Sequence, residues 1–275
     1  MVSKPLIDFL PLKRYGFTRL MFSLVIFIFL FLPRSVWAQE NFYQIINGSL
    51  DAVDDSFASD RGYSVFVSYD DQKFLFDVGL RKESFLGNLK SAGIALDDVD
   101  FVVLSHRHSD HTRGWPFLRK AQASLPIYVP PGGGFSHISE SKEVDDHLKI
   151  TPNIIIIHSH DKKGSLDVTD ELSLLIKTKN GPYLFTTNSH TDFFMKVKKV
   201  EQFSRQNIYL HSGHIARRIS PDEMIETMAK KMKALNIRHI SPSHSSPQHD
   251  RIFKEICGSS YIPALVGKKV PLELY

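Results

Sequence analysis

A short apolar strand runs directly into a cluster of metal-binding side chains, and this motif constrains the chain more than any other part of its sequence. Residues 102–111 read Val-Val-Leu-Ser-His-Arg-His-Ser-Asp-His. Because alternate residues of an extended chain point the same way, we expect His106 and His108 to hold one metal ion from one side. Asp110 and His111 follow one step further round the loop and are expected to face a neighbouring ion. Imidazole and carboxylate ligands are typical of zinc, manganese or iron sites, so the motif predicts a metal centre.

The histidines of the chain are confined to one stretch of it. All 13 lie between residues 106 and 249. Ligands that gather at one edge of a sheet need rigid strands behind them and loops in front. We interpret a further pair, His158 and His160, as exposed histidines at a strand end. Several histidines directly follow apolar segments that we expect to be strands: His106, His158, His190, His211 and His244.

Short apolar segments rich in β-branched residues alternate with amphipathic helical segments, and no internal repeat is present. Cys257 is the only cysteine, so no intrachain disulfide is possible. We expect it to be an inert residue of the last helix. Ser220 is expected to cap a helix that has Pro221 in its first turn. A run of lysines in the helix expected over residues 191–203 predicts a solvated face: Lys196, Lys198 and Lys199.

Residues 1–38 have the parts of a secretory signal peptide. Basic residues precede an apolar run of 13 residues from Leu20 to Leu32, and Val36 and Ala38 are the small residues expected before a cleavage after Ala38. A membrane span needs about 20 apolar residues, which is more than this run provides. We therefore expect an exported, periplasmic or secreted protein with no stable membrane insertion after cleavage. A retained N-terminal anchor is the alternative. Residues 39–275 fit a single domain.

The basic character of the chain comes from this leader. Five of the 34 Lys and Arg residues and one of the 30 Asp and Glu residues lie in it, which leaves 29 of each sign. Proteins that bind nucleic acid usually present a basic face. The balance of charge therefore favours a small-molecule substrate and no nucleic-acid partner, and it carries no signal for an oligomeric state.

The metal-binding motif and several other segments resemble the metallo-β-lactamase-fold superfamily. Its signature is similar to residues 104–111, which we call the histidine loop, and its Asp-x-Gly at a strand end is similar to Asp77-Val78-Gly79. Within the superfamily the chain most resembles the dihydropterin–ribofuranosylaminobenzene phosphate synthase-like branch. The resemblance covers most of residues 60–250 and implies an α/β fold, a four-layer αββα sandwich with a metal centre at one edge. The likeness to the branch rests on residues 170–177, 188–190, 213–214 and 242–244.

The resemblance also implies roles for single residues. His214 would contact substrate or metal, and Asp77 would hold the histidine loop from behind the ligands. The cofactor would be one or two divalent ions, with zinc expected first and manganese or iron as alternatives. The implied metal ligands are His106, His108, Asp110, His111, His190 and His244.

Two positions depart from the pattern of the branch. Pro130-Pro131 stands where the branch usually has a histidine, and Asn188 stands where it usually has cysteine, near a bridging aspartate of other members. A neutral amide bridges two cations poorly, so the second metal site is expected to be weak or missing. His137 is a candidate replacement for the missing ligand.

A divalent ion lowers the pKa of water from about 16 to about 7, which supplies hydroxide at neutral pH. Asp110 would orient this water and accept its proton. The sequence therefore predicts an exported metal-dependent hydrolase that acts on an ester, lactone, amide or phosphoester. Two alternatives stay open: a metal-dependent transferase of the dihydropterin synthase-like type, and a non-catalytic metal-bearing protein that binds or senses a ligand.

Overall fold

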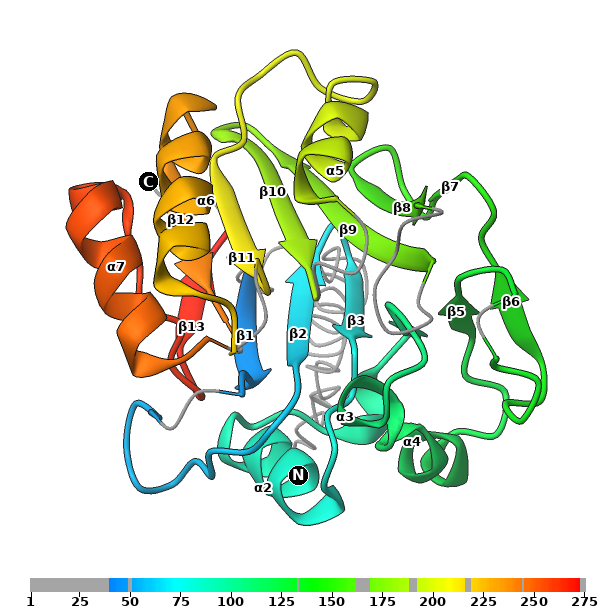
Figure 1. Cartoon of the computed structure of the whole chain (residues 1–275). Coiled ribbons are helices and arrows are strands. Elements are labelled where there is room, and N and C mark those ends of the chain that lie inside the picture. The colour runs from blue at the N-terminus through cyan, green and yellow to red at the C-terminus, as the bar shows by residue number, and fades with distance from the viewer. Residues whose placement is uncertain are drawn as a thin grey trace, which may run out of the picture. The chain divides into compact units, whose positions relative to one another are not determined.

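The computed structural model describes residues 40–48, 51–132, 134–161, 169–187, 192–215, 219–243 and 245–272. The predicted signal peptide, residues 1–38, lies outside this part of the chain. In the described residues the strands form two sheets, one of seven strands in the order β13-β1-β2-β3-β4-β5-β6 and one of six in the order β12-β11-β10-β9-β8-β7 (Figure 1). The strands of the first sheet are β1 (Asn41–Ile46), β2 (Ser64–Tyr69), β3 (Gln72–Phe76), β4 (Phe101–Val103), β5 (Ile127–Val129), β6 (Ser141–Glu143) and β13 (Lys269–Pro271). Those of the second are β7 (His147–Lys149), β8 (Ile154–His160), β9 (Asp170–Thr178), β10 (Gly181–Thr186), β11 (Leu210–Gly213) and β12 (His239–Pro242).

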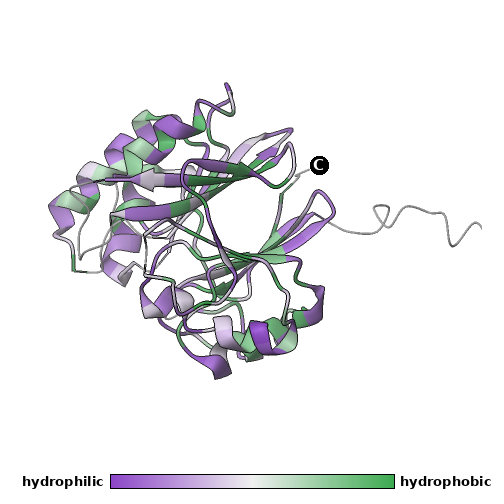
Figure 2. Cartoon of the chain, turned by 90° about the vertical axis from the view of Figure 1, so that its right-hand side faces the viewer, coloured by the Kyte–Doolittle hydropathy of each residue, from purple (hydrophilic) through white to green (hydrophobic). Residues whose placement is uncertain are grey.

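Helices cover the outer face of each sheet, so the described residues form the four αββα layers (Figure 2). The helices on the first sheet are α2 (Lys82–Ser91), α3 (Ser109–Thr112) and α4 (Trp115–Ala121). Those on the second are α5 (Phe193–Val200), α6 (Asp222–Ala234) and α7 (Pro247–Cys257). Two short 3-10 turns complete the assignment: η2 (Leu96–Asp98) and η3 (Gly258–Ser260). The predicted fold class is therefore confirmed.

The strands are apolar on both sides because each sheet is buried on both faces. Side chains of a strand alternate between the two faces with a period of two. In β2, Val65 and Val67 pack between the sheets, whereas Phe66 packs under α2 and α4. In β9, Leu174 packs between the sheets and Leu175 packs under the helices of the second layer. This double burial gives continuous apolar runs instead of an alternating pattern.

Local turn chemistry agrees with the sequence in part. Asp70 and Asp71, expected as a hairpin turn, adopt φ values of 54° and 58° between β2 and β3, as a type I′ turn requires. The expected Ser220 cap is wrong, because α6 starts at Asp222 with Pro221 in the cap position and no side-chain cap bond. Cys257 ends α7 and is buried.

Within the described ranges, no helix is both long enough and apolar enough to cross a membrane.

Candidate metal centre

The histidine loop leaves the C-terminal end of β4, which pairs in parallel with β3 on one side and β5 on the other. The Leu104 N–H donates to the Tyr128 carbonyl at 2.9 Å, and the Ser105 carbonyl accepts from the Leu172 N–H at 2.8 Å. Leu172 belongs to β9 of the other sheet. The start of the loop is therefore bonded to both sheets before the first histidine is reached.

Three imidazole rings of the loop pack against one another. The centroid of the His106 ring lies 4.7 Å from that of His108 and 4.3 Å from that of His111. His106 and His111 are buried, and His108 is half-buried. The structure thus brings together three of the predicted ligand side chains, with His106 in the middle.

Asp77 lies behind the histidine loop, just after β3, in the left-handed region with a φ of 59° and fully buried. Its Oδ1 accepts from the Ser105 N–H at 2.7 Å, and its Oδ2 accepts from the Ser105 hydroxyl at 2.8 Å. The His111 Nδ1 is 2.7 Å from the same Oδ2. One carboxylate therefore fixes both the first turn of the loop and its last histidine.

With Asp77 as a carboxylate, these contacts assign the proton of each ring to one nitrogen. Asp77 accepts only, so the His111 Nδ1 must donate to it. The Ser105 hydroxyl already donates to Asp77, and the His106 Nδ1, 2.9 Å away, therefore donates to the Ser105 Oγ. With Nδ1 protonated in both rings, Nε2 is the atom through which His106 and His111 would bind a metal. The donor set and the fixed tautomers fit a divalent cation.

Burial acts on the pKa values of Asp77, His108 and His111. It raises the pKa of Asp77, against the attraction of His111 and the hydrogen bonds from Ser105. Burial alone would lower the pKa of His111, but the Asp77 carboxylate outweighs it and the pKa is raised. Burial, together with repulsion from His111, lowers the pKa of His108, which keeps that ring neutral and able to bind a metal at pH 7.

Asp110 packs against a segment that lies far from it in sequence. Its carbonyl accepts from the Tyr63 N–H at 3.3 Å, and its Oδ2 is 3.5 Å from the Nε of Arg61. Gly62 makes this approach possible, since it has a φ of 103° and a Cβ there would lie 1.8 Å from the Asp110 carbonyl oxygen. The side chain of Asp110 is 13% exposed, whereas that of Arg61 is 70% exposed. Asp110 is therefore reachable from solvent beside an exposed cation.

The second sheet meets the histidine loop at the carboxyl ends of β10, β11 and β12. These strands are parallel, and Thr186, Gly213 and Pro242 share one register. The hydroxyl of the buried Tyr63 lies 3.3 Å from the Ser212 Oγ, which links this edge to the segment against Asp110. His214 follows β11 here and is buried, with its Nδ1 3.1 Å from the Thr187 carbonyl. The structure thus places His214 at the edge expected for a site residue.

Three of the predicted site residues, Asn188, His190 and His244, lie outside the described residues, and their roles stay predictions. The chain leads towards them from Thr187 and Ser243, at the ends of β10 and β12. In the described ranges alone, no group of three or more His, Cys, Asp or Glu side chains could hold a metal ion.

The pair His158 and His160 is not simply exposed, because both rings contact Asp170. The His158 Nε2 is 2.8 Å and the His160 Nδ1 is 2.9 Å from the Asp170 Oδ1, and the Thr169 hydroxyl donates to Oδ2 at 2.7 Å. His158 is buried, which corrects the sequence-based interpretation. Burial by itself would raise the pKa of Asp170, but the hydrogen bonds from Thr169, His160 and His158 lower it.

This cluster predicts an acid-sensitive contribution to stability. A carboxylate with a lowered pKa stabilises the fold above its unfolded pKa of 3.8 and loses that contribution as the pH falls through the folded value. We expect Asp170→Asn to lower the unfolding temperature at about pH 6 and to have a smaller effect near pH 3. Thermal unfolding at both pH values measures this, with the exposed Asp97→Asn as the matched control. A deficit of equal size at both pH values would contradict the prediction.

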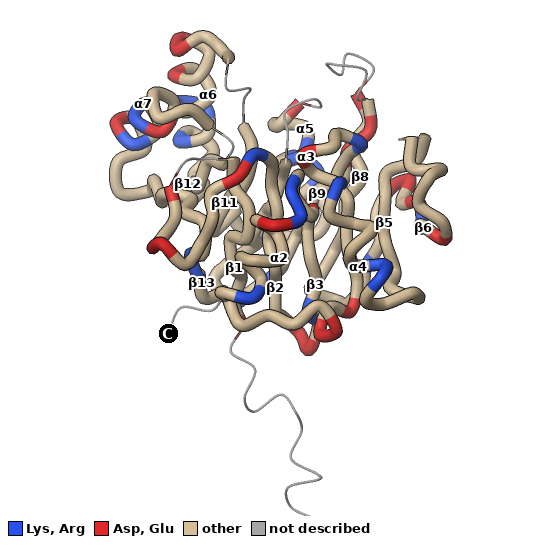
Figure 3. Tube along the Cα trace, turned by 90° about the horizontal axis from the view of Figure 1, so that it is seen from below, with Lys and Arg blue, Asp and Glu red and all other residues tan. Residues whose placement is uncertain are grey.

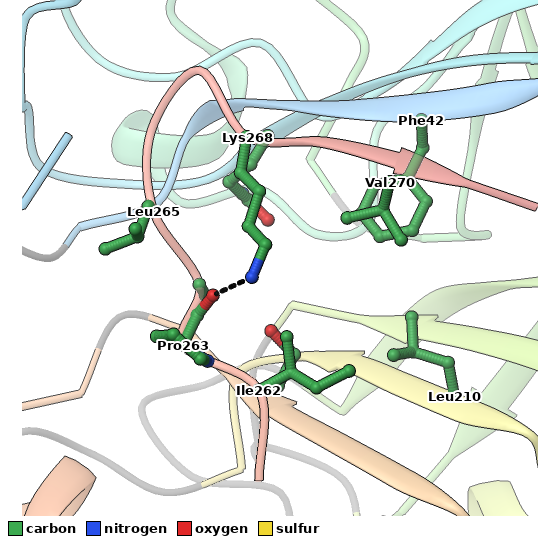
Figure 4. Close-up of a pocket in the computed structure, with 10 residues that line it drawn as sticks. Phe42, Leu210, Ile262, Pro263, Leu265, Lys268 and Val270 are labelled. Atoms are coloured by element: carbon green, nitrogen blue, oxygen red, sulfur yellow. Dashed lines mark hydrogen bonds between the residues drawn. The ribbon is translucent and has the colours of Figure 1, made fainter. Parts of the chain in front are cut away.

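A separate pocket lies on β1 and β13, where Lys268 donates to the Pro263 carbonyl at 3.3 Å (Figure 4). Leu210, at the start of β11, lines it, whereas the other end of β11 borders the histidine loop. None of the described residues that line this pocket is His, Asp or Glu. The described lining therefore offers no imidazole or carboxylate ligand for a metal, and the candidate metal centre is the histidine loop.

Two features of the site were not expected from the sequence. Arg61 and Gly62 carry no local signal for their contact with Asp110, because it depends on how distant segments pack. Lys196, expected on a solvated face, is buried and ion-paired with Glu171 at 2.8 Å. Helical spacing could have revealed this, since Phe193, Lys196 and Val200 form one buried face of α5.

His137, the candidate replacement ligand, lies beside Trp115 and Phe135, at ring-centroid distances of 6.1 Å and 6.5 Å. Its Nδ1 is 3.1 Å from the Gly134 carbonyl. These contacts are those of an exposed loop histidine.

Part of the chain is similar to a known protein family, and the chain has similar proteins among those of known function. A family model described as a beta-lactamase superfamily domain matches residues 73–178, which span β3 to β9 and include the histidine loop. Among curated proteins, the chain is 24% identical to 7,8-dihydropterin-6-methyl-4-(beta-D-ribofuranosyl)-aminobenzene-5'-phosphate synthase of Methanocaldococcus jannaschii, over 68% of this chain and 81% of the relative. It is 22% identical to exodeoxyribonuclease YycJ of Bacillus anthracis, over 66% and 78%.

Among solved structures, that of Tm1679, titled a metal-dependent hydrolase of the beta-lactamase superfamily, superimposes with a TM-score of 0.69 at 20% identity. The match covers 86% of this chain and all of that one. The two sheets, the position of the histidine motif after β4 and these comparisons agree: the described residues have the metallo-β-lactamase fold, and residues 73–178 are similar to the beta-lactamase superfamily domain.

Proposed function

We propose that the protein is a metal-dependent hydrolase whose centre is built on the histidine loop. The observation that carries this proposal is the packing of His106, His108 and His111 with their tautomers set by Asp77 and Ser105. The buried Asp77 carboxylate orients two imidazoles, one directly and one through Ser105. Histidines that bind a metal usually have such a hydrogen bond from the ring nitrogen that does not face the metal.

In this proposal the protein groups divide the work. A divalent cation, zinc by preference and manganese or iron otherwise, would supply the Lewis acidity that activates water and polarises the substrate. His106 and His108 would hold a first ion and Asp110 and His111 would face a second, and His190 and His244 would complete the centre. Asp110 would orient the attacking water and accept its proton, because its carboxylate is reachable from solvent.

Among the substrates considered, a small phosphoester is favoured over a neutral lactone or amide. Arg61 lies 3.5 Å from Asp110, Arg107 stands between His106 and His108 in the sequence, and both are exposed. Guanidinium groups suit phosphate oxygens. The name of the exodeoxyribonuclease relative points to the same bond type. A nucleic-acid substrate is not proposed, because α6 and α7 carry charges of both signs (Figure 3) and the chain after residue 38 is balanced.

A transferase is the second candidate, and the name of the Methanocaldococcus jannaschii relative favours it. In that case the metal would act on a pterin substrate and a new carbon–carbon bond would form. Product analysis separates the two, since hydrolysis yields an acid and an alcohol whereas transfer joins two substrates. We further propose export, with cleavage after Ala38, which mass measurement of the protein from the medium or periplasm tests.

We expect His106→Ala to abolish turnover of phosphoesters and to weaken zinc binding by more than about 100-fold. Replacing a residue that only hydrogen-bonds a metal ligand already weakens metal binding by up to about 100-fold, and His106 would be a ligand itself. Elemental analysis and chelator competition measure the metal, and a panel of phosphodiester, lactone and ester substrates measures the activity. His137→Ala is the matched control and is expected to keep both. Full metal content and turnover in the His106 variant would refute the proposed function.

A further inference from the structure

The buried ion pair between α5 and β9 has no part in the chemistry described so far. Lys196 is 2% exposed and Glu171 is 1% exposed, and their Nζ and Oε2 atoms are 2.8 Å apart. Removing two charges from water costs several kcal/mol per ion, and two apolar side chains of similar volume are often at least as stable. Stability alone is therefore a poor reason for such a pair at the centre of a helix face.

The position of each partner relates the pair to the candidate metal centre. Glu171 stands next to Leu172, whose N–H donates to the Ser105 carbonyl directly before His106. Lys196 lies in the first turns of α5, which starts after Asp192, where the Asp192 side chain accepts from the Phe194 N–H at 2.8 Å. This helix begins directly after the segment that contains His190. The pair thus joins the strand behind one set of predicted ligands to the helix that follows another.

The two charges of the pair lie towards different parts of the site. Glu171 is one residue from the Leu172 N–H that bonds the start of the histidine loop at 2.8 Å. On the other side, burial and the Lys196 ammonium lower the pKa of His211 to about 3. Glu171 is therefore on the histidine-loop side of the pair, and Lys196 on the side of β11.

We propose that Glu171 and Lys196 are a positioning pair that aligns α5 with the histidine loop and sets the charge beside it, with Glu171 favouring a bound cation and Lys196 holding that carboxylate in place. This inference rests on the metal centre of the proposed function. It implies unequal effects of the two partners. Loss of the Glu171 charge leaves a buried ammonium that repels a cation, whereas loss of the Lys196 charge leaves a carboxylate that attracts one.

The test compares zinc affinity with stability in the full chain. Glu171→Gln, Lys196→Met and the double variant are made, and zinc affinity is measured by chelator competition and thermal unfolding after metal removal. We expect both single variants to unfold at lower temperature, because each removes one charge of a buried ion pair and keeps the other charge buried. Zinc affinity should fall by about 10- to 100-fold in Glu171→Gln but not fall in Lys196→Met. The double variant should regain unfolding temperature while its zinc affinity lies between those of the two single variants.

Controls and alternative outcomes keep the inference falsifiable. The exposed pair Glu226 and Lys230, 3.2 Å apart, provides Glu226→Gln and Lys230→Met with the same changes of charge and no expected effect on either readout. If Glu171→Gln does not fold, Lys196→Met alone decides, since weaker zinc binding in it overturns the inference. Equal losses of affinity in both single variants, or no change in either, would leave only a structural pair. Failure of the unaltered chain to bind any divalent cation would overturn the proposed function as well.

Discussion

Replacing Asp77 by asparagine is expected to weaken zinc binding by about 10- to 100-fold, although the side chain would touch no metal. The carboxylate accepts from the Ser105 N–H, the Ser105 hydroxyl and the His111 Nδ1. An amide offers one acceptor oxygen and places an NH2 group against a donor, so the order of protons on His106 and His111 is lost. Breaking this buried charged contact should also cost about 3 kcal/mol of the free energy of unfolding.

Chelator competition and urea unfolding of the metal-free chain measure the two effects. Asp71→Asn is the matched control, because Asp71 is exposed and shares the left-handed conformation, with a φ of 58° against 59° for Asp77. Asparagine tolerates this conformation as well as aspartate does, so the control isolates the buried contacts. Unchanged zinc affinity in Asp77→Asn would show that the tautomers of His106 and His111 are set by something else.

The second large effect is expected at Gly62, where alanine should destabilise the fold by about 3 kcal/mol or more. Its φ of 103° is strained for an L-residue, and the added Cβ would lie 1.8 Å from the backbone oxygen of Asp110. Backbone cannot give way as a flexible side chain can. The loop therefore has to move away from Asp110, which should also reduce turnover.

Gly87→Ala provides the control for this prediction, because Gly87 is exposed in α2 and an added Cβ would meet nothing within 4 Å. Alanine in a helix is favoured over glycine by about 1 kcal/mol, so this variant should be slightly more stable. Urea unfolding of both variants gives the comparison. If Gly62→Ala is as stable as the unaltered chain, Arg61 and Gly62 do not pack against Asp110 as described.

The fold and the first half of the site follow from local sequence. Doubly buried strands give long apolar runs, and a histidine motif that directly follows such a run must lie at a sheet edge, as His106 to His111 do. The role suggested for Asp77 agrees with its contacts, although only measurement tests it. Asn188, His190 and His244 lie outside the described residues, so their part of the site stays a prediction.

Other features could not be predicted because they depend on distant packing. Nothing near Arg61 in the sequence indicates that Asp110 lies 3.5 Å away. Lys196 was expected on a solvated face because three lysines follow one another closely, but the helix turns only this one towards Glu171. A run of charged residues indicates that a helix has a solvent-exposed face. Which of those residues lie on that face follows from the helical period.

The hydrogen bonds that cross from one sheet to the other have a mechanical consequence. Ser105 is bonded to Leu172, and Tyr63 contacts Ser212, both at the edge where the histidines lie. A small rotation of one layer over the other would change the spacing of the groups at this edge. Substitutions deep between the layers, far from the histidine loop, would then alter the turnover of the proposed function. A cation bound at the histidine loop would in turn resist sliding of one layer over the other.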